Sequence, residues 1–133
     1  MEDMSRISVF LADDNENILA HVRTVLGPEF EIVGTAKSGI EAVTEVKRLK
    51  PDVLVIDISM PILNGLEVVA RLGFKSETRF VFLTVHKGED FVAAAFAAGA
   101  SGYVAKADLI TDLIPAIMQA LEGGKFVSQS IAS

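Results

Sequence analysis

Residues 52–61 read DVLVIDISMP, a run of apolar residues that stops at an aspartate. Residues 53–56 are apolar at consecutive positions, which is typical of a strand whose two faces are both covered by helices. We therefore predict a central strand of a parallel sheet here, with Asp57 at its carboxyl end.

Short apolar runs and stretches of helical period alternate on both sides of this segment, which indicates βαβ units. The predicted strands are residues 7–12, 30–36, 53–56, 79–84 and 102–105, and the predicted helices are about 16–26, 38–49, 64–72, 88–98 and 109–122. Right-handed crossovers between parallel strands then place helices on both faces. The predicted fold is an α/β protein with a five-stranded parallel sheet in a three-layer α/β/α sandwich.

The carboxyl-terminal part of the chain contains two irregular features. Pro115 lies inside the last predicted helix, so regular hydrogen bonding is expected to begin only near Thr111. Residues 1–124 are predicted to form one domain, and residues 125–133 a tail or the start of a linker.

The amino-acid composition disfavours several kinds of site and location for this chain. The 133 residues include no cysteine and two histidines, which disfavours disulfides and zinc sites and favours the cytoplasm. The chain starts Met-Glu-Asp without a secretory pattern, and its longest charge-free stretch, residues 91–105, is shorter than the roughly 18–20 residues of a membrane span. A net charge of −6 opposes direct binding of nucleic acid by this segment.

Five polar residues follow four of the predicted strands. They are Asp13, Asp14, Asp57, Thr84 and Lys106. Taken singly, each has an ordinary explanation: an aspartate or Asn15 can cap the first helix, and Thr84 can be a plain strand residue. Carboxyl ends of parallel strands share one edge, where open α/β sheets bind ligands. Together the five predict a divalent cation beside a carboxylate that can be phosphorylated.

These residues carry a resemblance to the receiver domains of two-component response regulators, over essentially the whole chain. The motifs are Asp13-Asp14, the stretch from Asp57 to Pro61 followed by Asn64-Gly65, Thr84, and Tyr103 with Lys106 three positions later. The resemblance implies a flavodoxin-like strand order, 2-1-3-4-5. Ala107 departs from the commonest pattern, in which proline follows the lysine.

The resemblance also implies a role for each residue of the site. Asp57 is the phosphoacceptor, and Mg²⁺ is held by Asp13, Asp14, Asp57 and the backbone carbonyl of Ser59. Thr84 and Lys106 bind phosphoryl oxygens, and Thr84 and Tyr103 form the conformational switch. The side chains of Ser59 and His86 flank the path of the water that removes the phosphoryl group, so they are expected to tune dephosphorylation.

The stretches AAGASGYVAKADL and LIPAIMQALEGGKFVS resemble the NarL/FixJ group, whose receivers usually precede a helix-turn-helix domain. This implies a sensor histidine kinase as partner, a possible phosphorylation-dependent homodimer, and DNA contact only through a domain beyond Ser133. Apolar residues of the last helix, Leu113, Ile117 and Leu121, are expected mostly in the core but could add contact area to a dimer.

Three alternatives are a stand-alone receiver, an aspartate-nucleophile phosphatase and a flavodoxin-like flavin-binding module. The phosphatase would need a second aspartate where Ser59 stands, so we expect no enzyme beyond self-phosphorylation and slow autodephosphorylation. Asp13-Asp14 would repel the phosphate of a flavin.

Overall fold

The computed structural model describes residues 6–73 and 76–132. Its longer elements are β1 (Ile7–Ala12), α1 (Glu16–Leu26), β2 (Phe30–Ala36), α2 (Gly39–Leu49), β3 (Val53–Ile56), α3 (Gly65–Leu72), β4 (Arg79–Thr84), α4 (Glu89–Ala98), β5 (Gly102–Ala105) and α5 (Leu109–Leu121). Short 3-10 turns, Gly27–Glu29 and Lys106–Asp108, precede β2 and α5. Met-Glu-Asp at the start, which we used in predicting no secretory signal, and Ser133, beyond which we expect any DNA-contacting domain, lie outside the described residues.

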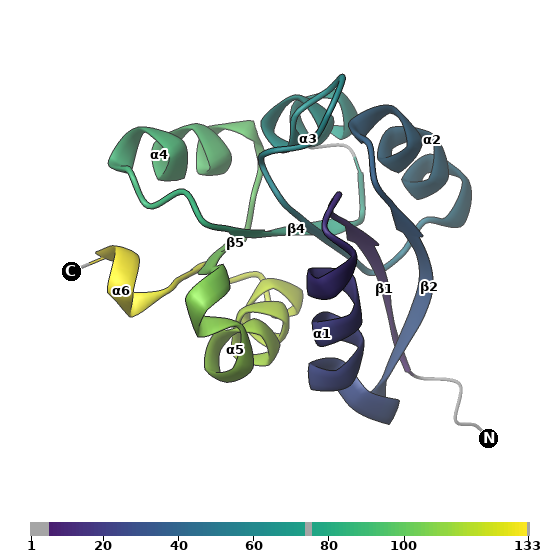
Figure 1. Ribbon diagram of the computed structural model, residues 1–133, viewed down its shortest axis with the longest axis horizontal. Helices are drawn as coiled ribbons and strands as arrows, with labels where there is room; N and C mark the ends of the chain where they lie inside the picture. Colours follow the sequence, from purple (N-terminus) through teal and green to yellow (C-terminus); the bar gives the residue numbers. More distant parts are fainter. Residues whose placement is uncertain (1–5, 74–75, 133) are drawn as a thin grey trace.

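The strands form one parallel sheet in the order β2-β1-β3-β4-β5, continued by a short β6 (Phe126–Val127). Helices α1 and α5 cover one face, and α2, α3 and α4 cover the other (Figure 1). The predicted α/β class, flavodoxin-like order and three-layer sandwich are confirmed. In the described part of the chain no helix is long and apolar enough to span a membrane.

The central strand β3 shows why its sequence is apolar without alternation. Val53 and Val55 pack in the apolar layer beneath α1 and α5. Leu54 and Ile56 pack in the layer beneath α2, α3 and α4. Because both faces are covered, all four side chains are buried, and a polar residue at any of them would lose its hydration without a partner.

Side-chain caps set where the helices begin. Asn15, not an aspartate, caps α1 by accepting from the backbone N–H groups of Asn17 and Ile18, and the hydroxyl of Ser38 caps α2 by accepting from the N–H of Glu41. Asn64 and Glu67 form a reciprocal capping box at the start of α3. Each cap satisfies N–H groups that the first helical turn leaves unpaired.

The last helix, α5, begins at Leu109, as predicted, and Pro115 lies within it. Pro115 is exposed, so its ring faces water. Proline has no N–H, so the carbonyl of Thr111, four residues earlier, loses its helical hydrogen bond. Thr111 is exposed as well, so water can reach that carbonyl.

The prediction of five strands is wrong, because the sheet has six. Phe126 and Val127 pair with Gly102 and Tyr103 of β5, and a short helix, α6 (Gln129–Ala132), follows. A two-residue strand is too short to produce a periodic apolar pattern, so the sequence could not indicate it. The segment predicted as a tail therefore carries ordered elements, and a domain boundary near residue 124 stays a prediction.

Candidate functional site

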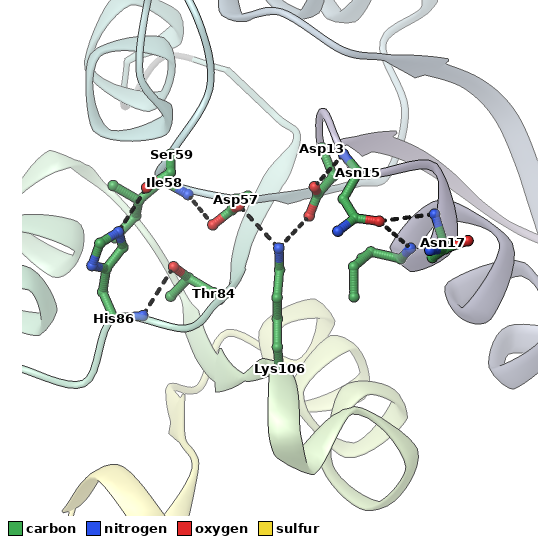
Figure 2. Close-up of polar contacts among 10 residues, drawn as sticks. Asp13, Asn15, Asn17, Asp57, Ile58, Ser59, Thr84, His86 and Lys106 are labelled. Atoms are coloured by element: carbon green, nitrogen blue, oxygen red, sulfur yellow. Dashed lines mark hydrogen bonds and ion pairs between the residues drawn. The ribbon is translucent and has the colours of Figure 1, made fainter.

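Lys106 links two of the predicted carboxylates at the carboxyl edge of the sheet. Its Nζ atom lies 3.0 Å from Oδ2 of Asp57 and 3.0 Å from Oδ2 of Asp13, as Figure 2 shows. The side chains of Asp13 and Asp57 are only 4% and 5% exposed, and that of Lys106 is 14% exposed. The loops after β1, β3 and β5 thus bring two acids and a cation into one largely buried cluster.

Asp57 is held rigidly by the backbone around it. Its Oδ1 accepts a hydrogen bond of 2.7 Å from the N–H of Ile58. The N–H of Gly65, at the start of α3, donates to the carbonyl of Ile58 at 2.8 Å. A Cβ at Gly65 would collide with the carbonyl oxygen of Asp57, so the close approach of α3 to this loop requires glycine. The other carboxylate oxygen, Oδ2, points to Lys106.

The two aspartates after β1 have different environments. Asp13 is buried, and its Oδ1 accepts from the N–H of Asn15 at 2.9 Å. Asp14 is exposed, yet an oxygen of each of Asp13, Asp14 and Asp57 lies within 4.8 Å of the others. Among the described residues, the one partner of Oδ2 of Asp13 is the ammonium of Lys106, 3.0 Å away. A buried carboxylate oxygen in this state is a ready ligand for a cation.

Burial and charge act against each other in this cluster. Burial raises the pKa of Asp13 above its ordinary value, aided by the charge of Asp57; the Asn15 N–H and Lys106 only partly offset that rise. Burial alone would lower the pKa of Lys106, but its pairing with Asp13 and Asp57 raises it overall. Lys106 therefore stays an ammonium at neutral pH. Burial therefore makes the carboxylate of Asp13 bind a proton more readily than a water-exposed acid does, and the charge of Asp57 adds a smaller effect.

The donor set fits Mg²⁺. One oxygen from each of three carboxylates lies within 4.8 Å of the others, and these are the hard oxygen ligands that this ion prefers. Among the described residues the buried Oδ2 of Asp13 has no partner besides Lys106, so it has room to coordinate an ion. No structural contact places the carbonyl of Ser59 in this set, so its part as a ligand stays a prediction.

Thr84, Tyr103, His86 and Ser59 form a second polar group beside Asp57. The hydroxyl of Thr84, a buried residue, accepts from the N–H of His86 at 3.3 Å. The hydroxyl of Tyr103 donates to the carbonyl of His86 at 2.8 Å. The imidazole of His86 lies 2.7 Å from Oγ of Ser59 (Figure 2). His86 therefore joins the two predicted switch residues to the loop that carries Asp57.

Tyr103 is turned inward in this structure. The residue is 0% exposed, and burial raises the pKa of its hydroxyl to about 12, with the charge of Asp57 adding to the rise. The hydroxyl is therefore neutral at physiological pH and acts as a hydrogen-bond donor. Its inward position depends on the β4–α4 loop, because its acceptor is the carbonyl of His86.

The comparisons with known proteins agree with this geometry. Residues 9–118 match the family described as the response regulator receiver domain. The chain belongs to the response regulator receiver family. Receiver domains are not a recognised family of catalytic enzymes, and the predicted resemblance is confirmed.

Relatives and solved structures place this receiver domain beside transcriptional response regulators. It is 31% identical to the transcriptional regulatory protein DegU of Brevibacillus brevis, over 96% of this chain and 55% of the relative. It is also 31% identical to the nitrate/nitrite response regulator NarL of Escherichia coli K12, over 98% of this chain and 62% of NarL. The chain thus spans little more than half the length of these relatives.

Two solved structures are similar as well. A LuxR-family two-component response regulator from Aurantimonas matches with a TM-score of 0.89 and 30% identity, covering 96% of this chain and 94% of that chain. The signal receiver domain of the NarL response regulator of Mycobacterium tuberculosis matches with a TM-score of 0.83 and 26% identity, covering 89% and 98%. The predicted NarL-type subgroup agrees with these relatives.

Proposed function

We propose that Asp57 accepts a phosphoryl group and that this chain is the receiver part of a transcriptional response regulator. The observation that carries the proposal is the contact of Lys106 with Asp57 and Asp13 at 3.0 Å each. An ammonium held between two buried carboxylates is positioned to bind phosphoryl oxygens at Asp57. The stand-alone receiver is less favoured, because the relatives above are transcriptional regulators longer than this chain.

Phosphoryl transfer to Asp57 needs no reactant other than the phosphodonor. An oxygen of the Asp57 carboxylate forms a bond to phosphorus, and the bond from phosphorus to the donor's leaving atom breaks. The leaving group keeps that electron pair, and Asp57 becomes an acyl phosphate. The hydrogen bond from Ile58 fixes one carboxylate oxygen of Asp57, so the other, Oδ2, is the proposed nucleophile.

The chain's own residues then hold the product. Lys106 keeps its charge, and its ammonium moves from the Asp57 carboxylate to a phosphoryl oxygen. The hydroxyl of Thr84 gives up its hydrogen bond with the N–H of His86 and donates to a phosphoryl oxygen instead. Mg²⁺, bound by Asp13, Asp14 and Asp57, supplies positive charge that offsets the charge of the transferring group. The proposed donor is a phosphohistidine of a sensor histidine kinase in the cytoplasm, and any contact with DNA belongs to a domain beyond Ser133.

Self-association after phosphorylation stays a prediction, and the three apolar residues of the last helix lie mostly in the core, as expected. Leu113 and Ile117 are 0% exposed, and Leu121 is partly buried. On α5 the exposed large apolar residues are instead Ile110, at 71%, and Met118, at 41%. A dimer through α5 would therefore use these two side chains.

The metal requirement tests the proposed function. The parent chain, incubated with acetyl phosphate, is expected to gain one phosphoryl group by intact-mass spectrometry with Mg²⁺ and almost none with excess chelator. Asp14→Ala removes an exposed ligand without disturbing the buried ion pairs. It should weaken Mg²⁺ binding by at least about tenfold, because loss of an outer-shell partner alone typically costs that much. Equal yields with and without Mg²⁺ would contradict the proposal.

Removing the imidazole of His86 is expected to change the lifetime of the phosphorylated form. Its contact with Ser59, 2.7 Å long, and its stacking on Phe91 hold the ring beside the loop that follows Asp57. His86→Ala should alter the dephosphorylation rate about threefold or more, an effect of at least about 0.6 kcal/mol on the barrier. The rate is followed by loss of the phosphorylated mass after desalting. The control is His21→Ala, on the exposed side of α1; if both variants keep the parental rate, His86 has no such role.

A further inference from the structure

The segment formed by β6 and α6 lies along β5, next to α5 (Figure 1). Ser128, the residue between the two elements, is 0% exposed. Its Oγ accepts from the backbone N–H of Ala105 at 3.1 Å and donates to Oδ2 of Asp112 at 2.7 Å. Its own N–H donates to the carbonyl of Tyr103 at 3.0 Å. Ser128 thus makes polar contacts with both β5 and α5.

These contacts reach the part of β5 that carries the proposed machinery. Ala105 is the last residue of β5 and directly precedes Lys106. A buried backbone N–H without a partner is costly, about 1–3 kcal/mol. The short β6 ends at Val127, so the ladder cannot supply that partner, and the hydroxyl of Ser128 does so instead. Asp112 in turn accepts from Ser128 and so fixes the direction of its hydroxyl proton.

The rest of the segment is attached by few contacts. Oγ of Ser130 donates to Oδ2 of Asp108 at 2.7 Å near the surface, and Lys125 lies 5.2 Å from the centre of the Phe96 ring. Val127 and Ile131 on one side and Phe126 on the other add partly buried apolar contact. A short element held by partly buried side chains can open locally at a lower free energy than the fully buried core.

We propose that Ser128 is a positioning residue for Lys106, and that docking of the β6–α6 segment and phosphorylation of Asp57 favour one another. This inference rests on the proposed function. In the docked state Ala105 is anchored, and Lys106 is aimed at Asp57 and Asp13. When the segment undocks, the end of β5 loses its anchor and the ammonium is no longer held over the site. Because binding linkage is reciprocal, a phosphoryl group bound by Lys106 stabilises docking by the same factor.

Phosphorylation kinetics test the first half of the proposal. At saturating Mg²⁺ and acetyl phosphate, Ser128→Ala is expected to gain its phosphoryl group about fivefold more slowly than the parent, which corresponds to about 1 kcal/mol on the barrier. Its Mg²⁺ affinity should stay parental, because Asp13, Asp14 and Asp57 keep their positions; general damage to the fold would lower both. The matched control is Ser130→Ala, which removes a hydroxyl from the same segment and is expected to keep the parental rate.

Amide hydrogen exchange on the parent chain and on Ser128→Ala tests the second half of the proposal. Saturating beryllofluoride and Mg²⁺ should slow exchange across residues 126–131 about fivefold or more, while Ser128→Ala should show no such gain. Unchanged or faster exchange in the parent would overturn the linkage, and a Ser128→Ala rate equal to that of Ser130→Ala would overturn the positioning role. If the parent gains no phosphoryl group at all, the proposed function falls together with this inference; if it does and these results fail, only the inference falls.

Discussion

Replacing Asp57 by alanine is expected to abolish phosphoryl incorporation from acetyl phosphate. Oδ2 of Asp57 is the carboxylate oxygen that contacts Lys106, and no neighbouring carboxylate can take over its place. Asp13 already accepts from Asn15 and lies on another strand, and Asp14 is exposed. Intact-mass spectrometry should show the unmodified mass of the variant after complete conversion of the parent.

The control for this variant is Asp52→Ala. Asp52 precedes β3 at the opposite end from Asp57, and its carboxylate accepts from the N–H and the hydroxyl of Ser8 at 2.9 and 3.1 Å. Loss of these exposed bonds should lower stability slightly and leave phosphorylation intact. A phosphorylated Asp57→Ala protein, at a yield near the parent's, would show that another residue is the acceptor.

Lys106→Met is expected to lower both stability and the rate of phosphorylation. It leaves the side chains of Asp13 and Asp57, 4% and 5% exposed, without their cation. Removing one partner of a buried ion pair costs several kcal/mol; we expect about 2 kcal/mol here, because protonation of Asp13 relieves part of the repulsion. Urea denaturation without Mg²⁺ measures this loss, and added Mg²⁺ should recover most of it.

The sign of the pH dependence follows from the raised pKa of Lys106. A base whose pKa is raised in the folded protein stabilises the fold below its unfolded pKa, and that contribution is lost as the pH rises through the folded pKa. The parent should therefore lose stability above about pH 10.5 relative to Lys106→Met. Lys37→Met is the control, since the pair of Lys37 with Glu16 is exposed and worth at most about 1 kcal/mol. If Lys106→Met matched this control, the buried cluster would not depend on Lys106.

Local sequence rules predicted most of the fold because local and tertiary preferences agree. The four apolar residues of β3 predicted a strand covered on both faces, and Asn64 and Ser38 marked helix starts through caps that the structure contains. The same rules treat Pro115 as a helix breaker, yet it lies inside α5. Packing of α5 against β5 and β4 outweighs one missing hydrogen bond.

The composition of the site was predictable, but its connections were not. The positions of Asp13, Asp57 and Lys106 at strand ends predicted that they meet, because parallel strands share an edge. No local pattern indicates that Ser59 contacts His86 across 27 positions. Likewise Ser128 reaches Ala105 across 23 positions, through a strand too short to be recognised. Such contacts depend on how loops from distant elements pack, which the chain does not encode in any periodic pattern.

Trapping the phosphorylated residue is the most direct test of the account. Borohydride reduces an acyl phosphate to an alcohol, so a phosphorylated aspartate becomes homoserine at its own position. After treatment of the parent chain with acetyl phosphate, Mg²⁺ and borohydride, peptide mass spectrometry is expected to find homoserine at position 57 and aspartate at positions 13 and 14. Homoserine at position 13 or 14, or phosphorylated protein in which position 57 remains aspartate, would contradict the assignment of Asp57 as the phosphoacceptor.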